Sequence, residues 1–544
     1  MADPSSQEQL WALRHQLVSD LLAELRGRAS DPREVQLIET HISWVLLGSE
    51  VYKIKKPVTL PFLDFASFEA RERACRTEVR INRRLAPRTY LGVVPIRRRA
   101  DGRFTLAADL DGAVAEWAVQ MTRLDETLRA DVLLEKGALG RVQVDALAHA
   151  IAAFHADSST GPDIRRLGSA DVIERNVSDN FAALRGWGEG VVPDVALAEI
   201  ERWQLDFVRA RRFLFEQRMR AGAIRDGHGD LRLEHVFFRE PADDFEVIDG
   251  IEFDDRYRYA DVCADIAFLA MDLARLGRVD LAERFVATYA RAANDFELYR
   301  LLDFYESYRA CVRAKISAGA MVSSQAPVAV VEAARADARR YLLFAQSARR
   351  RAVLDPVLVA VAGSIATGKS TLAERLGQEL SAPVVDADRT RKHMIGLAPT
   401  DHAAAGAWQG AYDPAFSERV YAEVLQRADA VLASGRPVII DASFRSADAR
   451  RAARQLAVAH GVPFRLFECV APLDVCRSRL AAREQATSVS DATPGVLDAF
   501  SAGYEPIIEL PPSEHVRMDT GGTADEALAA AMRAIATWPR GFVG

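Results

Sequence analysis

The segment from Gly363 to Ser370 reads Gly-Ser-Ile-Ala-Thr-Gly-Lys-Ser and has the spacing of a phosphate-binding loop. An apolar run over 357–362 predicts a buried strand before it, and an amphipathic run over 371–380 predicts a helix after it. The glycines let backbone N–H groups turn toward phosphate oxygens, and the helix N-terminus adds partial positive charge. Lys369 would reach the outer phosphates, and the Ser370 hydroxyl would hold Mg²⁺. The residues predicted to bind nucleotide here are Gly363, Ser364, Ile365, Ala366, Thr367, Gly368, Lys369, Ser370 and Thr371.

Three aspartates follow predicted strands downstream of this loop. Asp386 and Asp388 come after a strand over 383–385, and Asp441 ends the strand in GRPVIIDASF. One carboxylate of the Asp-x-Asp pair can take a water of Mg²⁺ while the other orients a substrate hydroxyl as general base. The pair resembles the Asp-x-Asp of shikimate-, gluconate- and zeta-toxin-type small kinases, which implies that Asp388 is the base and Asp386 a metal residue. Asp441 resembles a Walker-B-type metal acid, although Asp-Ala-Ser-Phe departs from the commoner acidic pair. Helix capping is the alternative role for such aspartates.

Several arginines could complete this site. Arg477, Arg479 and Arg483 lie on a predicted helix that leads into a polar loop. The arrangement looks like the lid of a small-molecule kinase, whose arginines close on the transferring phosphate, although arginine is also an ordinary surface helix residue. We predict catalytic roles for Arg479 and Arg483. In Arg-Thr-Arg-Lys, directly after Asp388, we predict that Arg391 contacts the substrate.

Alternating strands and helices must position these residues. The short basic segment 347–356 ends in proline and predicts a domain boundary, so we expect a second domain over 351–544. Further strands are predicted over 463–472 and 515–520, with helical segments between the strands. This pattern predicts a P-loop domain with a doubly wound parallel sheet, in which ligands bind beyond the carboxyl ends of the strands.

A second group of charged residues precedes the boundary. Lys53 and Lys55 fall on one face of a predicted strand, and Glu78 lies on the polar helix that follows. Strand pair, lysine, helix with glutamate and a further strand together suggest the small lobe of a kinase-like fold. We place this lobe at about 30–124 and a large helical lobe at about 125–350. The predicted elements are strands over 44–47, 51–55, 112–124, 236–238 and 245–248, and helices over 17–28, 66–85, 144–158, 199–220, 260–273 and 298–321.

The large lobe carries the motif HGDLRLEHV and, after two predicted strands, IDGIEFDDRYRYADV. These stretches, with ETHISWVLLGSEVYKIKKP, resemble the aminoglycoside phosphotransferase family, and more narrowly a bacterial group in which such a domain is fused to a C-terminal P-loop kinase. The resemblance implies an α+β kinase fold in which Asp230 is the catalytic base and Asp249 the main Mg²⁺ ligand. Lys55, or alternatively Lys53, would contact ATP phosphates and pair with Glu78.

One position departs from that pattern. The residue five places after Asp230 is usually an Asn that binds metal, and here it is His235. Mg²⁺ prefers oxygen ligands, whereas imidazole suits softer transition metals. His235 would therefore bind Mg²⁺ poorly, bind Mn²⁺, or not bind metal. Asp261 and Asp265, four residues apart on the predicted helix 260–273, would brace the catalytic loop rather than do chemistry.

Composition limits the remaining possibilities. The chain has 544 residues, which predicts two or three domains, and 49% hydrophobic and 27% charged residues are typical of a globular protein. A formal net charge of −7 argues against a dedicated nucleic-acid or anionic-membrane binder. The five scattered cysteines suggest a reducing compartment and no metal site. The sequence shows neither a signal-peptide pattern nor a long apolar run, so we expect a cytoplasmic protein without a membrane span.

These features predict an ATP- and Mg²⁺-dependent kinase that phosphorylates a hydroxyl of a small molecule, fused to a second kinase or to a degenerate binding module. Mn²⁺ is a possible metal at the N-terminal site. Two alternatives remain open: a P-loop ATPase switch without an acceptor, and a zeta-toxin-like nucleotide-sugar kinase. The sequence does not identify the acceptor.

Overall fold

The computed structural model describes residues 4–60, 63–107, 112–187, 190–239, 243–321, 327–347, 352–401, 410–483, 489, 497 and 502–535. The chain divides into two compact units, each of which is built from more than one stretch of sequence. Unit 1 comprises residues 1–143, 157–168 and 218–265, and unit 2 comprises residues 144–156, 169–217 and 266–544. The expected boundary near residue 350 therefore lies within unit 2, between its helical part and its P-loop domain.

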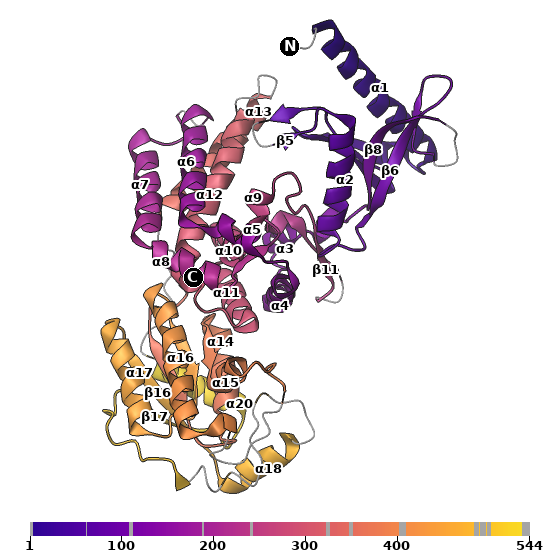
Figure 1. The fold of residues 1–544 in the computed structure, drawn as a ribbon. Coiled ribbons are helices and arrows are strands. Elements are labelled where there is room, and N and C mark those ends of the chain that lie inside the picture. The colour runs from indigo at the N-terminus through magenta and orange to yellow at the C-terminus, as the bar shows by residue number, and fades with distance from the viewer. Residues whose placement is uncertain are drawn as a thin grey trace. The chain divides into compact units, whose positions relative to one another are not determined.

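Unit 1 is built on an antiparallel sheet with the order β1-β2-β3-β8-β6-β7. Figure 1 labels two of its strands, β6 and β8, beside α2. α1 (Pro4–Arg28) packs on it through Leu17 and Leu21, which join a core around Trp44. α2 (Phe68–Asn82) also packs on the sheet, where buried Arg71 pairs with Glu116 of β8. The strands are β1 (Gln36–Glu39), β2 (Ser43–Leu47), β3 (Glu50–Lys55), β6 (Tyr90–Arg98), β7 (Phe104–Thr105) and β8 (Val114–Thr122). The predicted strands of this lobe are confirmed; the sequence analysis did not predict β1, β6 or β7.

Smaller elements complete unit 1. β10 pairs with β11, and β9 pairs with β12, both antiparallel. The predicted helix over 260–273 is wrong at its start, because Asp261 ends β12 and α10 begins at Val262. The short elements are α3 (Ala130–Glu135), α5 (Pro162–Arg165), α9 (Asp255–Arg258), β4 (Thr59–Leu60), β5 (Leu63–Asp64), β9 (Ile224–Asp226), β10 (Val236–Phe238), β11 (Phe245–Val247) and β12 (Tyr259–Asp261).

The helical part of unit 2 has a core rich in aromatic side chains. Phe207 stacks on Phe304 with ring centroids 5.0 Å apart, and buried Gln204 donates to Ser307 at 2.9 Å. The single helix predicted over 199–220 is two helices, because Arg211 leaves helical geometry between them. The helices before residue 350 are α4 (Arg141–Asp157), α6 (Ala170–Trp187), α7 (Asp194–Ala210), α8 (Arg212–Arg220), α10 (Val262–Arg275), α11 (Val279–Ala293), α12 (Tyr299–Met321) and α13 (Val328–Gln346).

The P-loop domain of unit 2 has a five-stranded parallel sheet with the order β14-β15-β13-β16-β17. The central strand β13 is buried along its whole length, so its sequence is uniformly apolar rather than alternating. The parallel sheet predicted from the sequence is confirmed. The strands are β13 (Leu358–Ala362), β14 (Val384–Asp386), β15 (Val438–Asp441), β16 (Phe464–Val470) and β17 (His515–Asp519). The helices are α14 (Lys369–Leu380), α15 (Ala387–Met394), α16 (Pro414–Ala433), α17 (Ala447–Ala459), α18 (Leu473–Arg483) and α20 (Ala524–Ala534).

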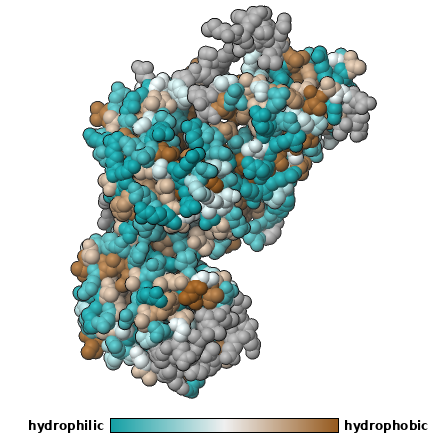
Figure 2. Space-filling view, viewed as in Figure 1, coloured by the Kyte–Doolittle hydropathy of each residue, from teal (hydrophilic) through white to brown (hydrophobic). Residues whose placement is uncertain are grey.

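On the face drawn in Figure 2, hydrophilic residues cover most of the described surface and apolar residues form small groups. Exposed apolar side chains such as Val195 and Phe213 are of the scattered kind that globular proteins normally carry. No helix of the described ranges is long and apolar enough to cross a membrane. All five cysteines belong to the described residues, and they are buried and form no disulfide.

Candidate active sites

The P-loop has the backbone shape that its sequence predicts. Gly363 and Gly368 have φ values of 146° and 92°, in the region that favours glycine. A Cβ at Gly363 would lie 2.6 Å from the Thr367 hydroxyl oxygen and 2.7 Å from the Cys469 carbonyl oxygen, so a side chain is also excluded by space. The Thr520 hydroxyl donates to the Thr367 carbonyl at 2.5 Å and fixes the far side of the loop. The predicted nucleotide-binding residues 363–371 form this loop and the start of α14.

The three predicted carboxylates meet next to the P-loop. Asp386 pairs in register with Asp441 across β14 and β15, and both are buried. Burial, and then Asp386, raise the pKa of Asp441 to about 7, against the opposing effects of Lys369 and of the Ser370 hydroxyl. Burial and Asp388 raise the pKa of Asp386. The half-buried Asp388 is the most accessible acid of the three, and Asp386 also caps α15 by accepting from the Arg389 N–H at 2.9 Å.

This acid cluster fits a hard divalent cation. The Asp441 Oδ1 atom is buried without a hydrogen-bond partner, which is costly unless an additional donor or cation satisfies it. Ser370, Asp441 and Asp386 offer oxygen atoms, the donors that Mg²⁺ prefers. Within the described ranges, no group of three or more His, Cys, Asp or Glu side chains could hold a metal. Mg²⁺ at such kinase-type sites takes only one or two carboxylates and completes its shell with waters and phosphates.

A cavity of about 350 Å³ opens beside the start of α14. Gly368, Arg479 and Thr520 line it, together with residues 522–524 after β17. Arg479 donates to the Thr520 carbonyl at 2.7 Å and to the Ala366 carbonyl at 3.4 Å, so this predicted lid arginine lies on the P-loop itself. The sequence analysis missed the Thr-Gly-Gly turn after β17. Its signal was a polar, glycine-rich turn at the carboxyl end of the fifth parallel strand.

The other predicted arginines differ in their surroundings. Arg483 is the last residue of α18, and the polar loop predicted after it lies mostly outside the described residues. Arg391 is 6% exposed, donates to Ser417 at 3.2 Å and lies over the Tyr412 ring at 4.6 Å. Arg391 therefore has protein partners, although its buried Nε has none in the described part of the chain. Its neighbour Arg389, which the sequence analysis passed over, also has a buried Nε without a hydrogen-bond partner among the described residues.

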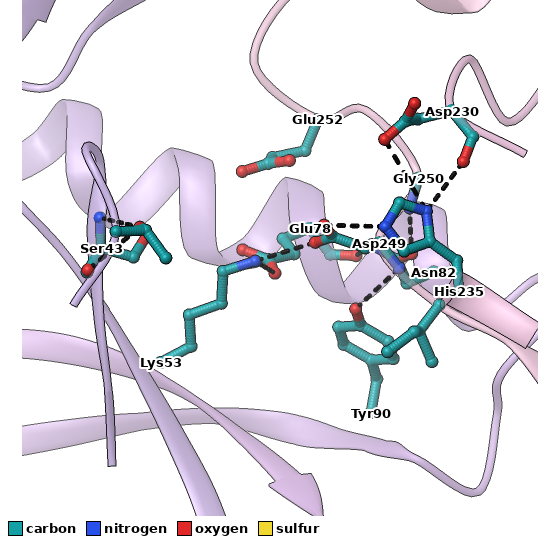
Figure 3. A network of polar contacts seen from close by, with 12 residues as sticks. Ser43, Lys53, Glu78, Asn82, Tyr90, Asp230, His235, Asp249, Gly250 and Glu252 are labelled. Atoms are coloured by element: carbon teal, nitrogen blue, oxygen red, sulfur yellow. Dashed lines mark hydrogen bonds and ion pairs between the residues drawn. The ribbon is translucent and has the colours of Figure 1, made fainter. Parts of the chain in front are cut away.

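The second predicted site lies in unit 1, where two lysines and three acids form a network of ion pairs; Figure 3 shows Lys53 with the three acids. Lys53 pairs with Glu78 at 2.8 Å and with Asp249 at 3.0 Å. Lys55 pairs with Glu78 at 2.5 Å and with Glu252, which the sequence analysis did not identify. Burial opposes the charge of Lys53, but Asp249 and Glu78 outweigh it and hold the pKa of Lys53 well above its usual value. Both lysines contact Glu78, and Lys53 is the one that reaches Asp249.

The turn that carries Asp249 is held by its backbone. Asp249 has φ 63°, a left-handed conformation uncommon for a residue other than glycine. The Asp249 N–H donates to the Tyr90 hydroxyl at 3.2 Å, and the Gly250 N–H donates to Asn82 at 2.7 Å. Lys53 holds the pKa of the Asp249 carboxyl well below its usual range. Neither Tyr90 nor Asn82 was predicted: Tyr90 lies on β6, which was not predicted, and Asn82 is the last residue of the predicted helix α2.

Asp265 shapes the loop that carries Asp230. Its carboxylate accepts the N–H groups of His228 at 2.7 Å and Gly229 at 2.9 Å, as predicted for a bracing residue. Burial lowers the pKa of His228 to about 4, so its ring is neutral. The ring donates through Nε2 to the Ile248 carbonyl at 3.0 Å and thereby joins this loop to the Asp249 turn. Asp261 instead pairs with Arg218 at 2.7 Å.

His235 lies between Asp230 and Asp249 (Figure 3). Its Nδ1 donates to the Asp230 backbone carbonyl at 2.8 Å, which leaves Nε2 3.6 Å from the Glu234 carboxylate and 3.8 Å from the Asp249 carboxylate. A ring that donates through one nitrogen to a carbonyl and presents the other is the usual arrangement of a metal-binding histidine. One imidazole and one carboxylate suit Mn²⁺ better than Mg²⁺, so this pair does not match an all-oxygen Mg²⁺ site.

Three comparisons place the chain among known proteins. A family model described as an AAA domain matches residues 358–507. The gluconokinase from Sinorhizobium meliloti 1021 aligns with a TM-score of 0.25 at 17% identity, over 34% of this chain and 94% of that structure. The APS kinase of Mycobacterium tuberculosis, solved in complex with AMPPNP and APS, aligns with a TM-score of 0.25 at 21% identity, over 33% of this chain and 98% of that structure.

Two relatives are similar along most of the chain. They are the uncharacterized proteins Rv2004c of Mycobacterium tuberculosis and Mb2027c of Mycobacterium bovis. Each is 35% identical over 476 residues, which is 87% of this chain and 91% of the relative. An alignment of this length includes residues of both units. The chain belongs to the same protein family as these two mycobacterial proteins.

Proposed function

We propose that the P-loop domain is an ATP-dependent kinase that transfers a γ-phosphoryl group to a hydroxyl of a small molecule. The observation that carries this proposal is the position of Asp388, a half-buried carboxylate beside the buried Asp386–Asp441 pair and the P-loop. A phosphoryl acceptor needs a group that can receive its proton. Asp388 is two residues from the buried acid Asp386 and is more accessible. Asp388 can therefore accept a hydrogen bond from an acceptor hydroxyl, while Asp386 contributes to cation binding.

Each remaining group has a role in this proposal. The loop N–H groups and Lys369 bind the phosphates, and Arg479, which already contacts the loop, stabilises charge on the transferring group. Arg483 and Arg391 remain candidates for the lid and for the acceptor. Ser370, Asp441 and Asp386 would hold Mg²⁺, which when bound would neutralise charge on the phosphates. The cavity beside Gly368 and Thr520 is large enough to take part of a nucleoside.

We further infer that unit 1 is an aminoglycoside-phosphotransferase-like module with a second nucleotide site. Lys53, paired with Glu78, would contact nucleotide phosphates, and Asp249 would hold a divalent cation with His235 as a weak partner. Lys53 fits the phosphate role better than Lys55, because Lys55 is only 1% exposed and its second partner is Glu252, whereas Lys53 reaches Asp249. Asp230 would be the base of this site.

The test is a screen of hydroxylated metabolites for acceptor-dependent ADP release by the full chain. We expect at least one acceptor whose turnover is abolished by Lys369→Ala and by Asp388→Asn but retained in Asp230→Asn. Arg375→Gln is the matched control and should retain turnover. Arg375 lies on the same helix as Lys369, and the substitution removes only its surface ion pair with Asp525. ADP release that no acceptor increases would contradict the kinase proposal and favour an ATPase switch.

A further inference from the structure

A helix from outside the P-loop domain borders the P-loop site. α11 belongs to the helical part of unit 2, and its arginines contact α14 at two levels. Arg284 donates to the Gln378 carbonyl at 3.0 Å, and Arg291, two turns further along α11, pairs with Glu374 at 2.6 Å. The two helices therefore lie side by side, and α11 approaches the nucleotide end of α14 at its own C-terminal end.

Arg291 lies close to the catalytic acids. Glu374 follows Ser370 by four residues on α14, so the two side chains share one face of the helix. Arg291 is thus about one helical turn from the residue proposed to hold the cation. Burial and Asp388 raise the pKa of Asp386, and Arg291 is one of the charges that oppose this rise.

Arg389 is a second cation at the same place. In the described part of the chain, its guanidinium forms no hydrogen bond or ion pair, and the Nε atoms of both Arg389 and Arg291 are buried without a hydrogen-bond partner. Arg389 follows Asp386 by three residues and donates to its carboxylate through the backbone N–H, and Arg291 pairs with Glu374. Burial, and then the charge of Arg291, lower the pKa of Arg389, against the opposing charges of Asp386 and Glu374. Two neighbouring cations with unused, buried donors are costly unless an anion satisfies them.

We propose that Arg291 and Arg389 bind an anionic group of the phosphoryl acceptor, a carboxylate, phosphate or sulfate, beside Asp386 and Asp388. The inference rests on the proposed kinase function and adds the charge class of the acceptor. The planar guanidinium fork matches the geometry of such anions. Because Arg291 comes from α11, acceptor binding by the P-loop domain depends on the helical part of unit 2.

The test uses the full chain saturated with AMPPNP and Mg²⁺, and inorganic sulfate as the probe, in isothermal titration calorimetry. The nucleotide analogue fills the phosphate positions of the P-loop, so sulfate reports on a separate anion site. We expect sulfate to bind the unsubstituted protein, and to bind Arg291→Gln and Arg389→Gln about tenfold or more weakly, as for the loss of one charge-assisted hydrogen bond. AMPPNP affinity should not change in these variants.

Arg300→Gln is the matched control, because it removes another ion pair between the helical part and the P-loop domain, with Asp429. It should leave sulfate affinity unchanged. Three results would overturn the anion site. Sulfate could fail to bind, it could bind all four proteins with equal affinity, or Arg300→Gln could weaken sulfate binding as strongly as the other two substitutions do. AMPPNP binding that Lys369→Ala does not diminish would instead overturn the proposed kinase function.

Discussion

Asp386 and Asp441 lie opposite each other at the carboxyl ends of the parallel strands β14 and β15, 8% and 4% exposed. Two buried carboxylates on directly paired residues of neighbouring strands do not both ionise readily, so the pair titrates as a unit. The pKa values of both carboxyls are raised, that of Asp441 to about 7. This pair links the stability of the ligand-free protein to pH and to divalent cations.

Stability of the metal-free protein should fall between about pH 4 and pH 7 through this pair. The Asp441 carboxyl ionises near 4 in the unfolded chain and near 7 in the folded one, so over this range the folded state binds more protons and loses stability as pH rises. Asp441→Asn removes the titration. In EDTA, its melting temperature relative to the unsubstituted protein should therefore be higher at pH 8 than at pH 5, whereas the exposed-site control Asp448→Asn should show no such trend. Mg²⁺ should raise the melting temperature of the unsubstituted protein and of the control, but not that of Asp441→Asn. A pH-independent difference would contradict the raised pKa.

Lys369→Ala should weaken ATP binding at the P-loop by at least about tenfold, the scale of one lost charge-assisted hydrogen bond, and leave the fold intact. The lysine begins α14 in a loop whose shape is held by Gly363, Gly368 and Thr520 rather than by its own side chain. Calorimetry of the full chain should show one binding event lost or weakened, with circular dichroism unchanged. Unchanged ATP affinity would rule out the P-loop as a nucleotide site.

Asp388→Asn should slow phosphoryl transfer by about 10²–10⁴-fold while ATP binding persists, because an amide keeps the shape of the side chain but cannot accept a proton. Asp386→Asn should instead weaken the dependence of ATP binding on Mg²⁺. Single-turnover rates with the acceptor, and ATP affinities with and without Mg²⁺, separate the two effects. Full turnover in Asp388→Asn with none in Asp386→Asn would mean that the two roles are exchanged.

His235→Asn should strengthen Mg²⁺-dependent nucleotide binding at the unit 1 site, or leave it level, because it supplies an oxygen ligand in place of an imidazole. The measurement is a Mg²⁺ and Mn²⁺ titration of ATP affinity in a Lys369→Ala background, which isolates this site. Asp249→Ala is the reference variant and should remove the metal dependence. If neither substitution alters affinity, unit 1 is a binding module without a metal site. A large loss of activity in His235→Asn would show that the imidazole itself takes part in the chemistry.

Arg436→Met should destabilise unit 2 by about 3–5 kcal/mol, the cost of removing one partner from a buried ion pair. Arg436 is completely buried and pairs with Glu283 and Asp303, each at 2.9 Å, so the substitution leaves two acids without their cation. The surface pair of Arg454 and Glu514 gives the control, since an exposed ion pair contributes little and Arg454→Gln should leave the free energy of unfolding almost unchanged. The measurement is the urea concentration at the unfolding midpoint of Arg436→Met and Arg454→Gln, monitored by circular dichroism. Equal midpoints for the two variants would show that the buried cluster is not stabilising.

Local sequence patterns were sufficient for much of the P-loop domain. The spacing of Gly363, Gly368 and Lys369 identifies the loop, since few other residues permit its backbone shape. Short apolar runs that end on Asp386 and Asp441 predicted where the acids would lie, because the carboxyl ends of parallel strands share one edge of a sheet. In unit 1, the alternation of side chains along β3 was enough to place Lys53 and Lys55 on one face.

Tertiary structure alone decided which of these groups meet. Which of Lys53 and Lys55 would contact the nucleotide follows from the position of Asp249, which is 196 residues from Lys53 in the sequence. The raised pKa of Asp441 arises from burial and from Asp386 on a neighbouring strand, neither of which a local pattern records. Arg291 lies on α11, in a stretch that the sequence analysis assigned to the N-terminal domain, and the buried Arg436 pairs with acids from that same region. Such contacts depend on how helices and sheets pack, because burial and charge pairing are properties of the folded neighbourhood and not of residue spacing.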